Sequence, residues 1–128
     1  MKLSHVYLCL MLAAAPSYAV EYFCKAERKF STEHQYTSQE IEKWKFSVRL
    51  EEMDNKAFVS RCSHVLSVAN LTCDRYEVDK FVFDKNVRLK KFYVFSSQYD
   101  FQLFADLTFV ENNGRGDVAY GKCQLVSP

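Results

Sequence analysis

The chain has little proline and little glycine. Of its 128 residues only two are proline and three are glycine, and both prolines, Pro16 and Pro128, lie near the ends. No Pro- or Gly-rich stretch could therefore serve as a linker between two domains, and no Gly-rich loop could hold the phosphates of a nucleotide cofactor. The sequence also contains no internal repeat and no low-complexity tract. These absences favour one continuous folded domain without a cofactor.

Neither sign of charge is in excess. The chain has 17 basic and 16 acidic residues, and one of the basic residues, Lys2, falls in the expected leader described below. Proteins that bind nucleic acid or an anionic membrane usually carry a basic surplus that attracts the phosphates. We therefore expect no nucleic-acid partner.

Motifs for metal binding and catalysis are also missing. The sequence has no Cys-x-x-Cys pair, no EF-hand loop and no Gly-x-Ser-x-Gly turn, and the histidines His34 and His64 stand alone. Asp100 and Asp106 would lie about 20 Å apart on one extended strand, too far for a shared site. We expect no metal, no catalytic residue and no enzymatic activity. A small secreted hydrolase with carboxylates brought together by the fold is an alternative.

The N-terminus has the pattern of a secretory signal. Lys2 precedes an apolar run from residue 6 to 15, and small residues lead up to Ala19. This pattern predicts a signal peptide over residues 1–19, cleaved after Ala19, and a single β domain over residues 20–128. The apolar run is about half of the ~20 residues that a membrane-spanning helix needs. We expect a periplasmic or secreted protein with no integral membrane segment after cleavage.

Four cysteines remain after the leader: Cys24, Cys62, Cys73 and Cys123. An even number of cysteines in an exported chain predicts disulfides, and four cysteines allow three pairings. Cys62 and Cys73 flank a short segment that could close a hairpin, and the other two lie near the ends of the mature chain. We therefore predict the pairs Cys24–Cys123 and Cys62–Cys73.

Alternation of apolar and polar residues dominates the rest of the chain. A period of two residues is typical of half-buried β-strands. Such extended runs cover residues 20–30, 44–51, 56–63, 71–83, 87–95, 99–110 and 118–126. One short helix is expected after Thr37, which forms a capping box with Glu40. The pattern predicts an all-β fold, a small antiparallel sandwich or barrel of about seven to eight strands.

The clearest local signal is a hairpin near the C-terminus. Residues 99–110 alternate as one long strand, a run of turn formers follows at 112–117, and a second extended run returns. If Cys123 is to face inward with Phe109, the turn must contain an odd number of residues, with Gly114 in a left-handed conformation. This register places a set of small and apolar residues inward: Ala119, Gly121, Cys123 and Leu125.

The tip of this hairpin is the first candidate binding surface. It carries Asn113, Arg115 and Asp117, and the last two belong to an Arg-Gly-Asp tripeptide of the kind that animal adhesion receptors read on exposed loops. Glycine and aspartate are also the residues that a tight turn demands, so turn chemistry is the favoured explanation of the tripeptide. An adhesion module is therefore one hypothesis for the function.

The second candidate surface is a basic strand. Arg88, Lys90 and Phe92 share one face of the run at residues 87–95. Basic residues beside an aromatic ring can bind a partner, although lysines on a strand also protect a sheet edge from aggregation. Because catalytic, metal and cofactor motifs are missing, the sequence favours an exported, disulfide-stabilised binding protein. Its expected partner is another protein, which it binds or inhibits.

Overall fold

The computed structural model describes residues 19–65 and 70–127. These residues form one antiparallel sheet of nine strands in the order β4-β3-β2-β1-β9-β8-β7-β6-β5. The expected leader lies outside the described residues except for Ala19. The elements are β1 (Ala19–Phe30), α1 (Ser38–Trp44), β2 (Ser47–Met53), β3 (Lys56–His64), β4 (Leu71–Glu77), β5 (Lys80–Asp84), β6 (Leu89–Val94), the 3-10 helix η1 (Phe95–Ser97), β7 (Tyr99–Leu103), β8 (Thr108–Asn112) and β9 (Val118–Ser127).

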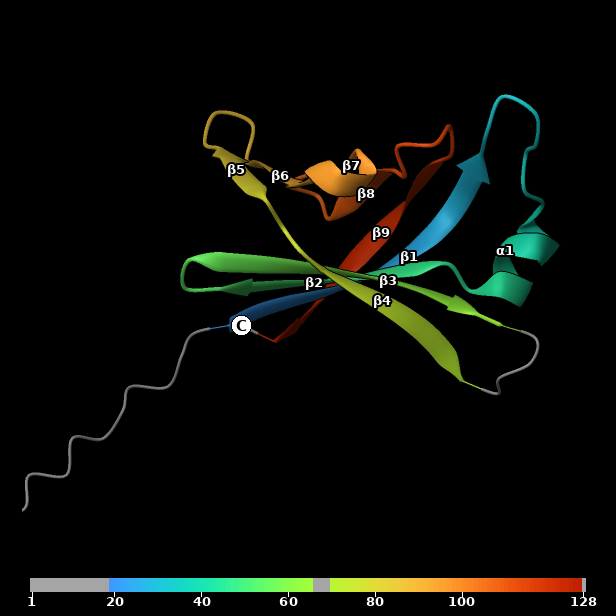
Figure 1. Ribbon diagram of the computed structural model, residues 1–128, viewed down its shortest axis with the longest axis horizontal. Helices are drawn as coiled ribbons and strands as arrows, with labels where there is room; N and C mark the ends of the chain where they lie inside the picture. Colours follow the sequence, from blue (N-terminus) through green and yellow to red (C-terminus); the bar gives the residue numbers. More distant parts are fainter. Residues whose placement is uncertain (1–18, 66–69, 128) are drawn as a thin grey trace, which may run out of the picture.

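The sheet curls on itself into a half-barrel (Figure 1). Strands β2 to β4 form one half, strands β5 to β8 form the other, and the long strands β1 and β9 connect the two halves. The edge strands β4 and β5 follow each other in sequence but pair only with β3 and β6. At the corner between them, Val78 N–H donates to Ala57 O and Asp79 N–H donates to Tyr93 O. The all-β prediction is confirmed.

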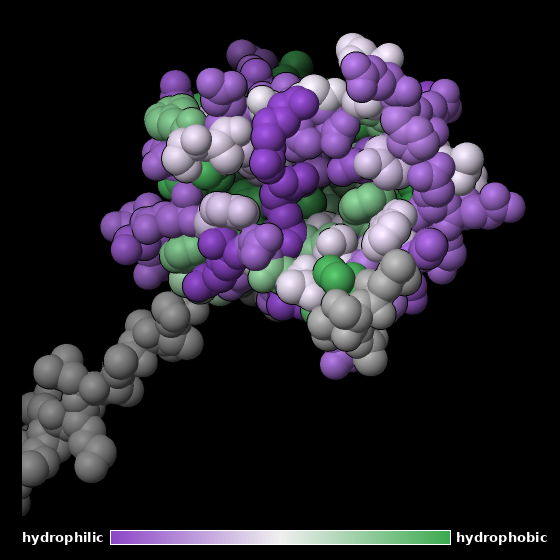
Figure 2. All heavy atoms as spheres, turned by 45° about the vertical axis from the view of Figure 1, so that its right-hand side comes forward, coloured by the Kyte–Doolittle hydropathy of each residue, from purple (hydrophilic) through white to green (hydrophobic). Residues whose placement is uncertain are grey.

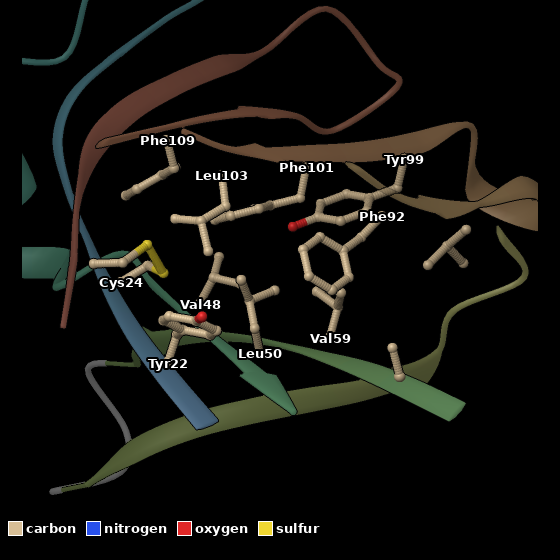
Figure 3. Close-up of a cluster of buried hydrophobic side chains, with 13 residues drawn as sticks. Tyr22, Cys24, Val48, Leu50, Val59, Phe92, Tyr99, Phe101, Leu103 and Phe109 are labelled. Carbon is tan, nitrogen blue, oxygen red and sulfur yellow. A yellow bond between two sulfur atoms is a disulfide. The ribbon is translucent and has the colours of Figure 1, made fainter. Parts of the chain in front are cut away.

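The inner face of the curled sheet holds the apolar core (Figure 3). Side chains of a strand alternate between its two faces, so every second residue points inward. The largest fully buried side chains are Phe92, Phe101, Phe109, Leu50, Val59 and Cys24. Phe101 and Phe109 stack with ring centroids 4.9 Å apart, and such a pair contributes about 0.5–1.5 kcal/mol beyond its buried area.

Both predicted disulfides are confirmed. Cys24 of β1 bonds Cys123 of β9, its direct cross-strand neighbour, and this bond joins residues 99 positions apart. Cys62 of β3 bonds Cys73 of β4 in the same cross-strand manner, over 11 positions. The first disulfide therefore ties the two ends of the chain together inside the core, and the second holds an edge strand to the sheet.

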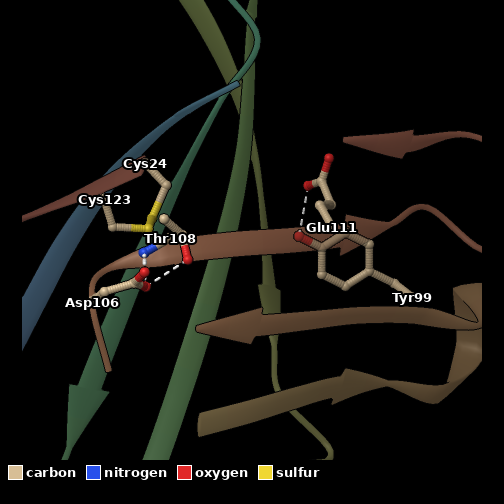
Figure 4. The surroundings of a disulfide bond; sticks show 6 residues. All are labelled: Cys24, Tyr99, Asp106, Thr108, Glu111 and Cys123. Carbon is tan, nitrogen blue, oxygen red and sulfur yellow. Dashed lines mark hydrogen bonds between the residues drawn. A yellow bond between two sulfur atoms is a disulfide. The ribbon is translucent and has the colours of Figure 1, made fainter. Parts of the chain in front are cut away.

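The expected long strand at residues 99–110 is wrong. The chain turns after Leu103, so that β7 and β8 pair with each other. Leu107 adopts a left-handed conformation with φ of 68°, and its N–H donates to Phe104 O. This is a type I turn closed by a left-handed residue, a common three-residue hairpin loop. Asp106 Oδ1 accepts hydrogen bonds from the backbone and hydroxyl of Thr108 (Figure 4), which fixes a turn that has no glycine or asparagine.

The C-terminal hairpin has the predicted register. Asn112 pairs with Val118, which leaves a five-residue loop, and Gly114 has a φ of 77°. Ala119, Gly121 and Cys123 are buried on the inner face, as expected. Leu125, which was also expected inside, is 52% exposed. It lies past the end of β8, whose pairing with β9 begins only at Lys122.

The capping box is confirmed as well. Glu40 N–H donates to the Thr37 hydroxyl, and Thr37 N–H donates to the Glu40 carboxylate. The helix runs to Trp44, and Lys45 ends it in a left-handed conformation. For this reason the next strand begins at Ser47, three residues later than the alternation predicts.

Candidate functional site: a groove at the mouth of the half-barrel

The edge strand β5 exposes aromatic residues on its inner face. Phe81 pairs with Phe92 and Phe83 pairs with Lys90, so both β5 residues face the interior of the half-barrel. Phe81 is nevertheless 44% exposed and Phe83 is 46% exposed, whereas Phe92 is fully buried. No strand of the described residues pairs with the outer edge of β5. Its inner face therefore remains partly uncovered.

A groove of about 620 Å³ separates β5 from the hairpin between β2 and β3, and we call it the β5 groove. Phe81 forms one wall, and the hairpin residues from 52 to 57 form the other. Val20 of β1 lies in the lining as well, and Val78 closes the groove where its N–H is bonded to β3. The groove thus combines a lining of mixed apolar and charged residues with an edge strand whose outer side pairs with no strand of the described residues.

A second hollow of about 230 Å³ lies beside Phe83 at the other end of β5. Its lining comes from β1, from β6 and from the turn between β7 and β8. The residues are Tyr22, Phe83, Arg88, Lys90, Leu103, Phe104, Ala105 and Leu107. This hollow is apolar apart from the two cations and the tyrosine, and we call it the basic hollow.

Three polar side chains bridge the half-barrel between these two openings. Lys90 Nζ donates to the carboxylate of Glu52 at 3.0 Å and to the hydroxyl of Tyr22 at 3.1 Å. Burial acts to lower the pKa of Lys90, but the bonds to Glu52 and Tyr22 outweigh it and raise this pKa above its ordinary value. Lys90 is therefore charged at neutral pH. We call these residues the mouth cluster.

The predicted basic strand face is thus only partly correct. Lys90 and Phe92 share a face, as the alternation indicates, but this face is the inner one. Phe92 belongs to the core and has no exposed surface to offer a partner. Arg88 lies in the turn before β6, with φ of 55°, and its side chain lines the basic hollow. Arg88 and Lys90 are therefore accessible at the mouth, and Phe92 is not.

Hydrogen bonds among its own residues fix the hairpin tip. Asn113 is buried, and its side-chain oxygen accepts bonds from the N–H groups of Arg115 and Asp117. Its amide donates to the Asp117 carboxylate at 3.2 Å. A Cβ at Gly114 would overlap the carbonyl oxygen of Gln98, so the base of the loop packs against η1. Of the three expected contact residues, only Arg115 is exposed.

A second polar cluster lies deeper in the half-barrel, and we call it the inner cluster. Glu111 accepts hydrogen bonds from Arg61 Nε at 3.2 Å and from the Tyr99 hydroxyl at 2.7 Å, the latter shown in Figure 4. Burial raises the pKa of Tyr99 well above its usual range, and the Glu111 charge adds to this effect. The hydroxyl therefore remains a donor at neutral pH.

Lys29 lies beside the inner cluster. Its side chain is buried, with Nζ 4.4 Å from the centre of the Phe46 ring, and desolvation lowers its pKa despite the nearby charge of Glu111. Lys29 and Ser47 both line a cavity of about 30 Å³, and the Ser47 hydroxyl has no hydrogen-bond partner among the described residues. A cavity of this size accommodates a single water molecule and no larger ligand.

Polar residues cover most of the face seen in Figure 2, with smaller apolar patches between them. Among residues 19–65 and 70–127, no group of three or more His, Cys, Asp or Glu side chains could hold a metal ion. Within the same residues, no helix is both long and apolar enough to cross a membrane. No protein-family model, curated protein or solved structure matches the chain. The two disulfides fit a small β protein of the periplasm or the extracellular space.

Several residues of the site were not predicted from the sequence. Phe81 and Phe83 alternate on a short run that ends in turn formers, which is the usual pattern of a hairpin strand. Their exposure could have been suspected because β5 has charged residues at both ends and only five positions. Glu52 and Tyr22 contact Lys90 across 38 and 68 positions, and no local pattern indicates such contacts.

Proposed function

We propose that the protein is an exported binding protein that recognises an extended segment of another protein at the β5 groove. The observation that carries this proposal is the exposure of Phe81 and Phe83 on the inner side of an unpaired edge strand. Added strands commonly gain affinity from main-chain hydrogen bonds and specificity from pockets for alternate side chains. The β5 groove offers both of these features.

The binding free energy would come from adding a strand to the edge of the sheet and burying its exposed aromatic residues. A segment that pairs with β5 would cover the two phenylalanines, and each fully buried phenylalanine side chain is worth about 1.5–3 kcal/mol relative to an exposed one. Phe81 already contacts Phe92, with ring centroids 5.1 Å apart, so its ring is held in place before the partner arrives. Preorganised aromatic side chains lose little entropy on binding and are frequent hot spots of interfaces.

The other two hypotheses gain no comparable support. At the hairpin tip, Asn113 is buried and donates a hydrogen bond to the Asp117 carboxylate, so that of the three candidate residues only Arg115 is exposed. For a hydrolase, Asp106 is engaged with Thr108 in the turn whose residues Ala105 and Leu107 line the basic hollow, and the residues that line this hollow include no carboxylate. We therefore propose binding without catalysis.

The experiment is a comparative capture from the periplasm or culture fluid of the source organism. The immobilised protein is compared with Phe81→Ser and Phe83→Ser variants, and Phe95→Ser serves as the matched control. Phe95 is also an exposed phenylalanine, 61% accessible, but it lies in η1 and lines neither opening. We expect a saturable partner that is retained by wild type and Phe95→Ser and is lost with the β5 variants. Equal retention by all four proteins would contradict the proposal.

A further inference from the structure

The two openings along β5 carry opposite charge. The β5 groove is lined by Glu52, Asp54, Asp79 and a single cation, Lys56. Glu52 is neutralised by Lys90, and Lys56 lies 3.8 Å from Glu77, which leaves the two aspartates as the uncompensated charges. Asp79 Oδ2 accepts a bond from Phe95 N–H, which fixes its position but does not remove its charge. This end of the site is therefore acidic.

The other end is basic. Lys90 is paired with Glu52, but Arg88 has no salt-bridge partner within the described parts of the chain. Its side chain lines the basic hollow next to Phe83. Strand β5 begins beside Asp79, passes Phe81 and Phe83, and ends before the turn that carries Arg88. The charge thus changes sign along the strand.

We propose that the β5 groove and the basic hollow together select a segment by the order of its charges, an acidic side chain first and a basic one later. This inference rests on the proposed function and specifies the chemistry of its partner. Every strand pair of the described sheet is antiparallel, and an added strand that follows this pattern runs opposite to β5. Its N-terminal part then lies by Arg88 and its C-terminal part by Asp54 and Asp79.

The spacing follows from strand geometry. Side chains that face the same way recur every second residue, about 6.6–6.8 Å apart. Two apolar side chains of the segment would lie beside Phe83 and Phe81, with the acidic residue two positions before them and the basic residue two positions after. The expected segment therefore has seven residues. The first is acidic, the third and fifth are apolar, the seventh is basic, and the other three can be any residue.

The test uses three fluorescently labelled peptides and the complete purified protein. The forward peptide contains Glu-Thr-Val-Thr-Val-Thr-Lys, the reversed peptide exchanges its glutamate and lysine, and the neutral peptide has glutamine at both positions. Fluorescence anisotropy measures each dissociation constant at low and at physiological salt. Two partly exposed ion pairs should favour the forward over the reversed peptide by about tenfold at low salt, and less at physiological salt.

A charge-reversal variant sharpens the test. Arg88→Glu combined with Asp54→Lys should prefer the reversed peptide, whereas a matched variant with two reversals away from the site, Arg115→Glu with Glu33→Lys, should keep the wild-type preference. Equal binding of all three peptides to wild type would overturn the charge-order inference and leave strand addition standing. If none of the three peptides binds, the proposed function fails together with the inference. A preference for the reversed peptide in wild type would also overturn the inference.

Discussion

Two groups of a cation, a carboxylate and a tyrosine connect the halves of the sheet, and they have different surroundings. The inner cluster joins Arg61 and Tyr99 to Glu111, and the mouth cluster joins Lys90 and Tyr22 to Glu52. An apolar layer separates the two clusters, and its residues are Leu50, Val59, Phe92 and Phe101.

The chemistry of the clusters is the same, but the space around them is not. The hollow beside the inner cluster holds about 30 Å³, and the Glu111 side chain is 7% exposed. Beside the mouth cluster two hollows of about 620 and 230 Å³ remain open. The inner cluster therefore lies in a closed interior, and the mouth cluster lies at an opening. The same combination of side chains therefore occurs both in a closed interior and beside an open groove.

The largest loss of stability should come from removing a disulfide. The two disulfides also differ in their surroundings, because Cys24–Cys123 lies in the core and Cys62–Cys73 holds the edge strand β4. Replacing Cys24 and Cys123 by alanine releases 99 positions of chain, and replacing Cys62 and Cys73 releases 11. In the chain-entropy model we expect losses of about 4–5 kcal/mol and about 3 kcal/mol in the free energy of unfolding. Urea denaturation of the two variants measures both losses. Equal losses would mean that loop length does not distinguish the disulfides.

The next largest loss of stability is expected when the carboxylate of either cluster is replaced. Glu111→Gln removes the charged partner of half-buried Arg61 and the strongest counter-charge near buried Lys29, so we expect a loss of about 3 kcal/mol, the lower end of the cost of breaking a buried pair. Glu52→Gln leaves Lys90 beside open hollows that water can enter, so we expect about 1 kcal/mol. Thermal and urea denaturation of both variants provide the test. A larger loss for Glu52→Gln would contradict the assignment of the closed and open ends.

A smaller, pH-dependent effect is expected at Lys29. Because desolvation lowers its pKa in the folded state, the unfolded chain binds more protons between that lowered pKa and about 10.5. This lysine therefore contributes a stability that increases as the pH rises through this interval. Lys29→Met removes the contribution, so the stability of wild type relative to Lys29→Met should increase from pH 7 to pH 10. Denaturation at several pH values measures this difference, and a constant difference would show that Lys29 does not titrate differently in the folded state.

The smallest effect is expected at the hairpin tip, which belongs to neither cluster. Arg115 is exposed and makes no salt bridge with any residue in the described ranges. Arg115→Ala should therefore change the free energy of unfolding by less than about 0.5 kcal/mol. It should also leave the capture of the partner unchanged. Loss of attachment to receptor-bearing cells in this variant would instead support the adhesion hypothesis.

Much of the fold could be predicted because it depends on local patterns. Alternation indicates the strands, the capping box indicates the helix, and the requirement that Cys123 face inward fixed the register of the last hairpin. The turn at residues 104–107 was missed because the alternation continues through it and a leucine occupies the left-handed position where glycine is usual.

The site was harder to predict than the fold. Alternation places Lys90 and Phe92 on one face, but it does not say which face is inside when both faces contain basic and aromatic residues. The partners of Lys90 and Arg61 lie 38 and 50 positions away, and only the curl of the sheet brings them together. The β5 groove likewise results from how two edge strands separate, which no local pattern determines.

Hydrogen–deuterium exchange of the protein, alone and with saturating forward peptide, tests the central claim most directly. If the mouth is the binding surface, the peptide should slow exchange of the β5 amides at residues 80–84, with smaller changes in the facing hairpin at residues 52–57. The amides around Glu111, beside the closed inner cluster, should exchange as before. Protection at the hairpin tip, residues 113–117, without protection of β5 would contradict the account.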